Sequence, residues 1–250
     1  MDTRTPEYHN QFFTHLDYWG KIAENHDTIV YGYETLSHTR DFGRAINIPA
    51  IGGCFGYVQR GGITLNQNGT KMAVNAGSWF TSSNGASFTV GDRARVAVFQ
   101  RKAYEGYHGP YCAVGYVESF GRLKYINGCH DSLLASPIKK GDPCFSALYM
   151  PTGINQTLHT HPSTRCGVID LGEAVCETPE AQHQLAPGMI FFLPRDGWHK
   201  FRTDLKDTTM RLLAYHPDSD FGATDEDHPM LNRTLVDGVS AKDMPEVRTK

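Results

Sequence analysis

The sequence predicts an all-β protein made of two tandem jelly-roll barrels, with a short helix at the N-terminus. From about Thr28 onward, short β-branched and aromatic runs alternate with turns rich in Gly, Asn and Ser, as in GSWFTSSNGASFTV. This rhythm is typical of antiparallel strands. The chain also repeats itself, since Gly61 and Gly172 lie 111 residues apart, as do Gly77 and Gly188. One offset that fits both pairs indicates two copies of one β unit.

The N-terminal helix is predicted from its cap and its spacing. Thr5 and Pro6 suit the N-cap and first helical position, and aromatic and aliphatic residues follow at helical intervals from Tyr8 to Trp19. The predicted segments, in chain order, are an N-terminal helical segment (1–27), a degenerate first barrel (28–123), a connector (124–143), a metal-binding second barrel (144–217) and a C-terminal extension (218–250).

The connector and the extension are predicted from composition. Turn residues and the basic pair Lys139 and Lys140 fill the connector, which has no flexible Gly/Ser tract, so we expect two rigidly packed barrels. The extension is polar and acidic. It is predicted either as a solvated tail or as a lid held across a barrel mouth by Phe221, Met230 and Leu231.

Three histidines form a candidate metal site. His159 and His161 are two residues apart, so in a strand their side chains leave the same face. His199 follows the apolar run 189–193 and a Pro-Arg-Asp-Gly corner that turns the chain back. Three neutral imidazoles suit Zn, Fe, Ni or Cu and leave positions for water or substrate.

Around these histidines the chain resembles the cupin superfamily, whose motifs are G-x5-H-x-H-x(3,4)-E-x6-G and G-x5-P-x-G-x2-H-x3-N. The matching residues are Gly153, His159 and His161 in the first motif and Gly188, Pro194 and His199 in the second. The chain departs from the motifs at Cys166, which replaces the glutamate, at Gly197, shifted by one, and at Thr203, which replaces the asparagine. The resemblance therefore implies three histidine ligands and no carboxylate.

The first barrel is predicted to hold no metal. At the offset of the repeat, apolar residues occupy the positions of His159, His161, Cys166 and His199; they are Ile48, Ala50, Phe55 and Phe88. We expect this barrel to contribute stability rather than catalytic residues.

Cys166 also resembles a feature of the thiol dioxygenases, which are cupins with three histidine ligands. In that family a cysteine five residues after the second histidine is linked to a tyrosine beside the iron. Here His161 and Cys166 have that spacing, and Tyr215 lies about where the tyrosine is expected. The alternative is that Cys166 is a small apolar filler and Tyr215 a core aromatic.

Four other polar residues near the motifs are candidates for roles in catalysis or substrate binding. Arg165 flanks one of the two motif turns, Arg195 or Arg211 could hold a carboxylate, and His216 could relay protons near neutral pH. Surface charge is the alternative for the arginines.

Composition limits the partners. A net charge of −3 with scattered Lys and Arg excludes nucleic acid and anionic membrane as expected partners. No signal-peptide or membrane-spanning run is present, which predicts a cytoplasmic protein. The six cysteines lack a C-x2-C pair and are expected to be reduced thiols. A homodimer is left open.

The favoured function is an Fe(II)-dependent oxygenase, of dioxygenase type, that uses O2. Without a carboxylate ligand the metal keeps more positive charge, so a small anionic substrate that binds it directly is expected. The alternatives are a non-redox isomerase, epimerase, lyase or cyclase that uses Zn, Mn or Ni as a Lewis acid, and a small-molecule-binding protein without chemistry.

Overall fold

The computed structural model describes residues 13–15, 19–36, 42–67, 69–104, 112–204, 207 and 209–249. Over these residues the protein is nearly all β. The helices among them are two three-residue 3-10 turns, η1 (Ala241–Asp243) and η2 (Pro245–Val247). No helix in the described part of the chain has the length and apolar character needed to cross a membrane.

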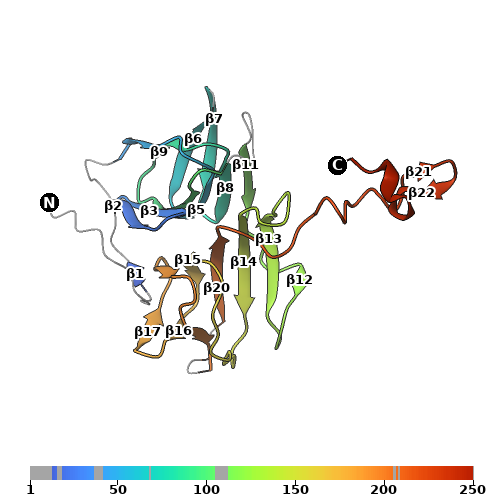
Figure 1. The fold of residues 1–250 in the computed structure, drawn as a ribbon. Coiled ribbons are helices and arrows are strands. Elements are labelled where there is room, and N and C mark those ends of the chain that lie inside the picture. The colour runs from blue at the N-terminus through green and yellow to red at the C-terminus, as the bar shows by residue number, and fades with distance from the viewer. Residues whose placement is uncertain are drawn as a thin grey trace.

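The first unit is formed by two facing sheets (Figure 1). Its strands are β2 (Trp19–Glu24), β3 (Thr28–Glu34), β4 (Ala45–Ile48), β5 (Cys54–Arg60), β6 (Gly62–Gln67), β7 (Thr70–Asn75), β8 (Ser78–Ser82), β9 (Ala86–Val90), β10 (Arg95–Arg101) and β11 (Cys112–Tyr116). A six-stranded sheet has the order β11-β8-β5-β10-β3-β2, and a four-stranded sheet has the order β4-β9-β6-β7.

The second unit pairs a larger sheet with a smaller one. Its strands are β1 (Phe13–His15), β12 (Leu123–Lys124), β13 (His130–Ala135), β14 (Cys144–Met150), β15 (Arg165–Leu171), β16 (Ala174–Glu177), β17 (Gln182–Leu185), β18 (Ile190–Leu193), β19 (Lys200–Arg202) and β20 (Met210–His216). The seven-stranded sheet has the order β1-β18-β15-β20-β14-β13-β12, and the three-stranded sheet has the order β17-β16-β19.

The two large sheets pack face to face and share an apolar core. Alternate residues of β5 and β10 meet alternate residues of β15 and β20 in this layer, which includes Phe55, Phe99, Cys166 and Tyr215. The rings of Phe99 and Tyr215 stack at 5.5 Å between centroids. Each large sheet is thus covered on both faces, because its other face packs against the small sheet of its own unit.

A polar contact crosses the same interface. Asp170 on β15 is 5% exposed and accepts hydrogen bonds from Tyr57 of the first unit and from Arg211 on β20. Because the carboxylate is paired with a guanidinium and a hydroxyl, its burial is compensated. Arg211, proposed above as a carboxylate clamp, is therefore engaged at the interface between the units.

Residues related by the 111-residue repeat of the sequence make equivalent packing contacts in the two units. Gly56 and Gly167 lie at the 111-residue offset, and in both a Cβ would meet a phenylalanine ring, that of Phe80 or Phe191, at 2.1 or 2.4 Å. The ladder of Phe55 opposite Phe99 in the first unit corresponds to that of Cys166 opposite Tyr215 in the second. Only glycine fits under the ring in either unit.

The N-terminal prediction needs correction. Most of the predicted helix lies outside the described residues, but Phe13–His15 is a strand paired with β18, and Trp19 opens β2, which pairs with β3. The predicted connector is also partly sheet, since β13 pairs with β14 along most of its length. Pairing with other strands decides both segments, and helical spacing and turn composition did not reveal that pairing.

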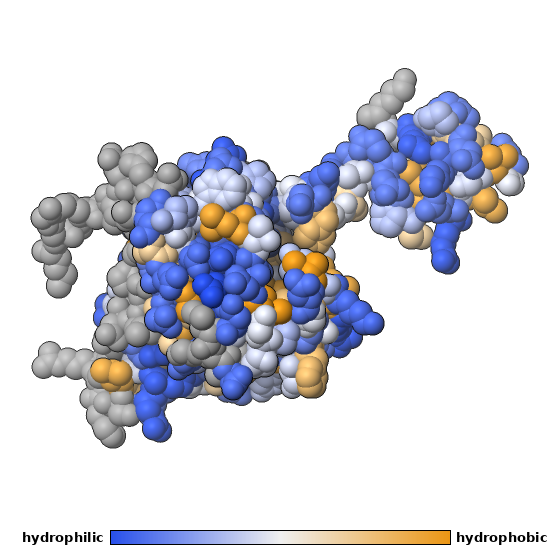
Figure 2. All heavy atoms as spheres, turned by 90° about the horizontal axis from the view of Figure 1, so that it is seen from below, coloured by the Kyte–Doolittle hydropathy of each residue, from blue (hydrophilic) through white to orange (hydrophobic). Residues whose placement is uncertain are grey.

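The C-terminal extension begins against the second unit, where Asp218 accepts a hydrogen bond from Ser163 and Ala223 forms a β-bridge with Lys139, and its later part stands away from the two units (Figures 1 and 2). It contains the short hairpin of β21 (Leu235–Val236) and β22 (Val239–Ser240). Phe221 and Met230, proposed above as lid contacts, are 40% and 57% exposed. In this structure the extension therefore does not cover the cavity described below.

Phe88 provides a test of the first unit's role. It is 1% exposed and packs edge-on against Tyr33 and Phe80. Truncating a buried Phe to Ala costs ~3–5 kcal/mol, so Phe88→Ala should lower the free energy of unfolding in urea by that amount, and Phe88→Leu by less. Metal content per folded chain should not change. Loss of metal at unchanged stability would contradict this role.

Candidate metal centre

His159, His161 and His199 are brought together by a single backbone bridge. His159 and His199 pair antiparallel, with N–O distances of 3.0 and 2.9 Å between their main chains. His161 lies two residues beyond His159, so its side chain returns to the same face. The sequence motif and the ladder thus place all three imidazoles on one side of the sheet.

The three rings form a compact donor set. Their ring centroids are 4.6 to 5.2 Å apart, and one potential ligand atom from each lies within 4.8 Å of the others. Within the described part of the chain this is the one group of three or more His, Cys, Asp or Glu side chains close enough to hold a metal ion. All members of the group are histidines.

Backbone carbonyls orient two of the rings. Nδ1 of His159 lies 2.7 Å from the carbonyl oxygen of Thr157, and Nδ1 of His199 lies 2.9 Å from that of Gly197. A carbonyl oxygen can only accept, so each Nδ1 carries the proton and each Nε2 keeps its lone pair. In this tautomer Nε2 can bind a metal while Nδ1–H is held by an outer partner, as is common among metal-ligating histidines.

The environment keeps the imidazoles of His161 and His199 neutral. Burial, reinforced by the charge of Arg165 and by the neighbouring rings, lowers the pKa of His161 to about 4. Burial is also the main cause that lowers the pKa of His199 to about 4. A neutral imidazole is required for ligation, so these two donors are ready at neutral pH.

The histidines open into a cavity of about 240 Å³ inside the second unit. Its wall is mainly apolar, with a few polar groups. The lining residues are Tyr125, Asp131, Ser146, Leu148, Gln156, His159, His161, Arg165, Phe191, Leu193, His199, Phe201, Leu212, Ala214 and His216. A mainly apolar wall with a few converging polar groups is typical of small-molecule sites.

Arg165 supplies a positive charge to this cavity. Its Nη1 donates to the hydroxyl of Ser163 and, at 3.0 Å, to the carbonyl of Thr164, and it lies 3.6 Å from Asp218. Its Nε is buried and has no hydrogen-bond partner among the described residues. One guanidinium donor is therefore free to bind a ligand in the cavity.

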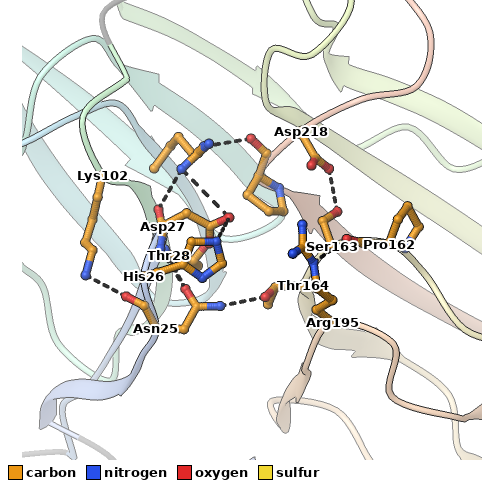
Figure 3. A network of polar contacts seen from close by, with 12 residues as sticks. Asn25, His26, Asp27, Thr28, Lys102, Pro162, Ser163, Thr164, Arg195 and Asp218 are labelled. Atoms are coloured by element: carbon orange, nitrogen blue, oxygen red, sulfur yellow. Dashed lines mark hydrogen bonds and ion pairs between the residues drawn. The ribbon is translucent and has the colours of Figure 1, made fainter.

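The first unit holds the loop that carries Arg165 (Figure 3). Asn25 donates to the Thr164 hydroxyl at 2.6 Å, and Arg101 donates to the carbonyl of Pro217 at 2.8 Å. Asp218, next to Pro217, accepts from Ser163. The first unit thus supports the cavity wall without contributing a residue to its lining.

Of the four remaining predicted site residues, one lines the cavity and three lie outside it. His216 lines it. Arg195 is exposed and donates to the carbonyl of Pro162 at 2.7 Å, so it holds the turn before His199 and does not face the cavity. Cys166 and Tyr215 are directly opposite each other on β15 and β20, as the thiol dioxygenase resemblance requires.

Their side chains, however, point away from the metal site. Cys166 and Tyr215 are fully buried in the apolar layer between the two units, and neither lines the cavity. Period-2 alternation explains this, because Arg165 and His216, one residue away on each strand, face the cavity instead. The prediction that Cys166 and Tyr215 lie beside the metal is wrong. Both act as packing residues, and burial raises the pKa of the Cys166 thiol.

The first unit repeats the bridge without the ligands. Phe88 pairs with Ile46 as His199 pairs with His159, so the counterparts of the first two histidines are Ile46 and Ile48. The predicted counterparts, Ile48 and Ala50, are two residues out of register. The loop before β5 differs in length from the corresponding loop of the second unit, so a fixed offset of 111 residues cannot align the residues that precede it.

Asp131 is a cavity residue that sequence reasoning missed. It lies on β13, within the segment predicted as a connector. Burial raises its pKa to about 6. The segment HDSLLA shows no polar–apolar alternation, and turn residues flank it on both sides, so the sequence carried no clear strand signal here.

Comparisons with solved structures decide the fold. A cupin 2 conserved barrel domain protein from Leptotrichia buccalis aligns with a TM-score of 0.60 and 12% identity, over 85% of this chain and 92% of that one. This chain has the cupin fold. Ylba from E. coli aligns at TM-score 0.58 and 16% identity, over 89% and 96% of the two chains. A salicylate 1,2-dioxygenase from Pseudaminobacter salicylatoxidans aligns at 0.56 and 9%, over 76% and 71%.

One family model also matches part of this chain. It describes the AraC-like ligand binding domain and covers residues 150–244, which include all three histidines. No curated protein sequence matches the chain. At identities this low, the structural similarities show the cupin fold and leave the chemistry to the site itself.

Metal stoichiometry tests the site. The full chain should bind one metal ion, and His161→Ala and His199→Ala should each lose it, because two imidazoles remain. His228→Ala, in the extension, is the matched control and should keep full occupancy. Metal analysis after dialysis measures the number of ions bound per chain in the wild type and in each variant. Two ions per chain, or full occupancy in His161→Ala, would contradict the assignment.

His216 gives a pH-dependent signature. Burial lowers its pKa to about 3, so the unfolded chain takes up this proton at a higher pH than the folded chain. The metal-free protein should therefore lose stability as pH falls below about 6.5. His216→Gln should reduce that loss by up to ~1.4 kcal/mol for each pH unit between 6.5 and 4. Urea unfolding at several pH values measures it, and parallel profiles would contradict the burial of His216.

Proposed function

We propose that this protein is an Fe(II)-dependent cupin oxygenase, of dioxygenase type, that acts on a small anionic metabolite. The observation that carries the proposal is the pairing of a neutral donor set with a free guanidinium donor. His159, His161 and His199 contribute no negative charge, and Arg165 adds a positive one to the same cavity. Both features favour an anionic ligand over a neutral one.

The donor chemistry fits iron. Three imidazole nitrogens that leave other positions open suit Fe(II), and also Zn, Mn or Ni, whereas no thiolate is in the cluster. Fe(II) held by these histidines would supply positions for the substrate and for O2. Carbonyl contacts at Nδ1 of His159 and His199 keep two of the ligand rings oriented.

The chain's other residues bind and shield the substrate. Arg165 can donate from Nε to a substrate carboxylate, which fixes one end of the molecule. Apolar side chains opposite, including Leu148, Phe191 and Leu212, displace water from the rest of the cavity. A dry wall strengthens the electrostatic attraction between the anion and the guanidinium.

One structural neighbour agrees with this substrate class. Salicylate, after which the dioxygenase described above is named, is an aromatic hydroxycarboxylate and could chelate a metal through both groups. The cavity of about 240 Å³ is of the size that a compact aromatic or aliphatic acid would occupy. We infer a small carboxylate with a second donor atom beside it.

Two alternatives keep specific support. Asp131, with a pKa raised by burial to about 6, could exchange protons near neutral pH, which favours a non-redox isomerase, epimerase, lyase or cyclase with Zn, Mn or Ni. The AraC-like match favours ligand binding without turnover. Metal identity and O2 uptake separate these alternatives from the oxygenase.

Oxygen uptake tests the proposal. Protein purified without oxygen and loaded with Fe(II) should consume O2 only when a suitable small carboxylate is added, and zinc-loaded protein should not. A panel of hydroxy, amino and keto acids, aromatic and aliphatic, supplies the candidates. Turnover with zinc and without O2 would favour the non-redox alternative, and binding without turnover would favour the binding protein.

Arg165 tests the anionic substrate. Arg165→Lys keeps the charge but removes Nε, so kcat/KM should fall ~10-fold or more, mainly through KM, because a charge-assisted hydrogen bond is lost. Arg93→Lys, at an exposed position of the first unit, is the matched control and should match the wild type. Equal effects of the two substitutions would contradict the role given to Arg165.

A further inference from the structure

The cavity contains a second buried polar atom without a partner. Oδ1 of Asp131 is buried and accepts no hydrogen bond from any residue that the structure describes, as Nε of Arg165 donates none. Both side chains line the same cavity. Unsatisfied buried groups are rare in folded proteins, and each calls for an explanation. Here two of opposite charge share one space.

Strand order places the two groups at opposite sides of the cavity. Arg165 is on β15 and Asp131 is on β13, with β20 and β14 between them. Three strand spacings lie between them, and the register places Arg165 level with Cys144 of β14 but Asp131 level with Leu148, so their backbones are roughly 19 Å apart. Asp131 pairs with Leu148, which also lines the cavity. A ligand held by Arg165 and the histidines would therefore present its far end to Asp131.

When its carboxyl group is ionised, Asp131 accepts hydrogen bonds and donates none. Burial is the main cause of its raised pKa, and contacts with the Ser132 amide and the Ser146 hydroxyl offset this in part. No cation is paired with it in the described part of the structure. A buried carboxylate with a free oxygen costs stability, so its position in a binding cavity indicates a function outside folding.

We propose that Asp131 is a specificity residue that accepts a hydrogen bond from an N–H or O–H group at the end of the substrate remote from Arg165. The expected substrates are then only some of the small anions. They are small carboxylic acids that also carry a hydroxyl or amino group away from their metal-binding end. This inference rests on the proposed function, since it assumes a carboxylate held beside the histidines.

The role of Asp131 can be tested by binding alone, with pairs of ligands that differ only in one hydrogen-bond donor. Calorimetric titration of the zinc-loaded full chain would compare amino- and hydroxy-salicylates with their methyl and methoxy counterparts at each free ring position. For at least one position the donor-bearing member should bind the wild type ~10-fold more tightly. Asp131→Ala should abolish that preference, and Asp131→Asn should narrow or reverse it because an amide can also donate.

Stability provides the second measurement. Asp131→Asn removes a buried charge and should raise the Tm of the metal-free chain at pH 8 by ~3–6 °C. The control is Asp237→Asn, at an exposed hairpin position with a φ of 50° that Asn tolerates; it should leave Tm and binding unchanged. A lower Tm for Asp131→Asn would show a structural role and overturn the inference.

The outcomes separate the two proposals. If the salicylates bind but no donor preference appears, or Asp131→Ala leaves the preference intact, the specificity role is overturned and the proposed function stands. If none of the salicylates binds the metal-loaded chain, the metal-bound anion is contradicted, and the inference fails with it. A donor preference that depends on Asp131 supports both.

Discussion

The architecture depends on sheets that are buried on both faces. The seven-stranded sheet packs one face against the first unit and turns the other toward the metal cavity. Side chains alternate along a strand. On β15 and β20, one residue of each neighbouring pair therefore faces the interface between the units and the other faces the cavity. Arg165 and His216 face the cavity, whereas Cys166 and Tyr215 face the interface. A one-residue slip in register would exchange these roles.

This arrangement explains why the unit with the three histidines is joined to one without them. The first unit covers the back of the seven-stranded sheet with Phe55 and Phe99, and its polar edge holds the loop before Arg165 through Asn25. It fills its own interior with Phe88 where the second unit has His199. One copy packs against the sheet and supports its loop, and the other carries the three-histidine cluster.

The sequence was sufficient for the β class, the 111-residue repeat and the three histidines, because glycine turns and an H-x-H pair have local signatures. It was insufficient where long-range pairing decides the outcome. Helical spacing at Trp19 was overridden by pairing with β3, and Asp131 entered the cavity through a strand hidden among turn residues. Spacing placed Cys166 and Tyr215 side by side correctly, yet it could not tell which face of the sheet would meet the metal.

X-ray absorption at the iron edge of the full chain, loaded without oxygen, tests the central claim most directly. We expect three imidazoles in the first coordination shell, with the remaining positions filled by oxygen donors that change when a small hydroxycarboxylate is added. A sulfur scatterer at about 2.3 Å, the distance of a metal–thiolate bond, or fewer than three imidazoles would contradict the assignment of His159, His161 and His199 and the orientation of Cys166 away from the cavity.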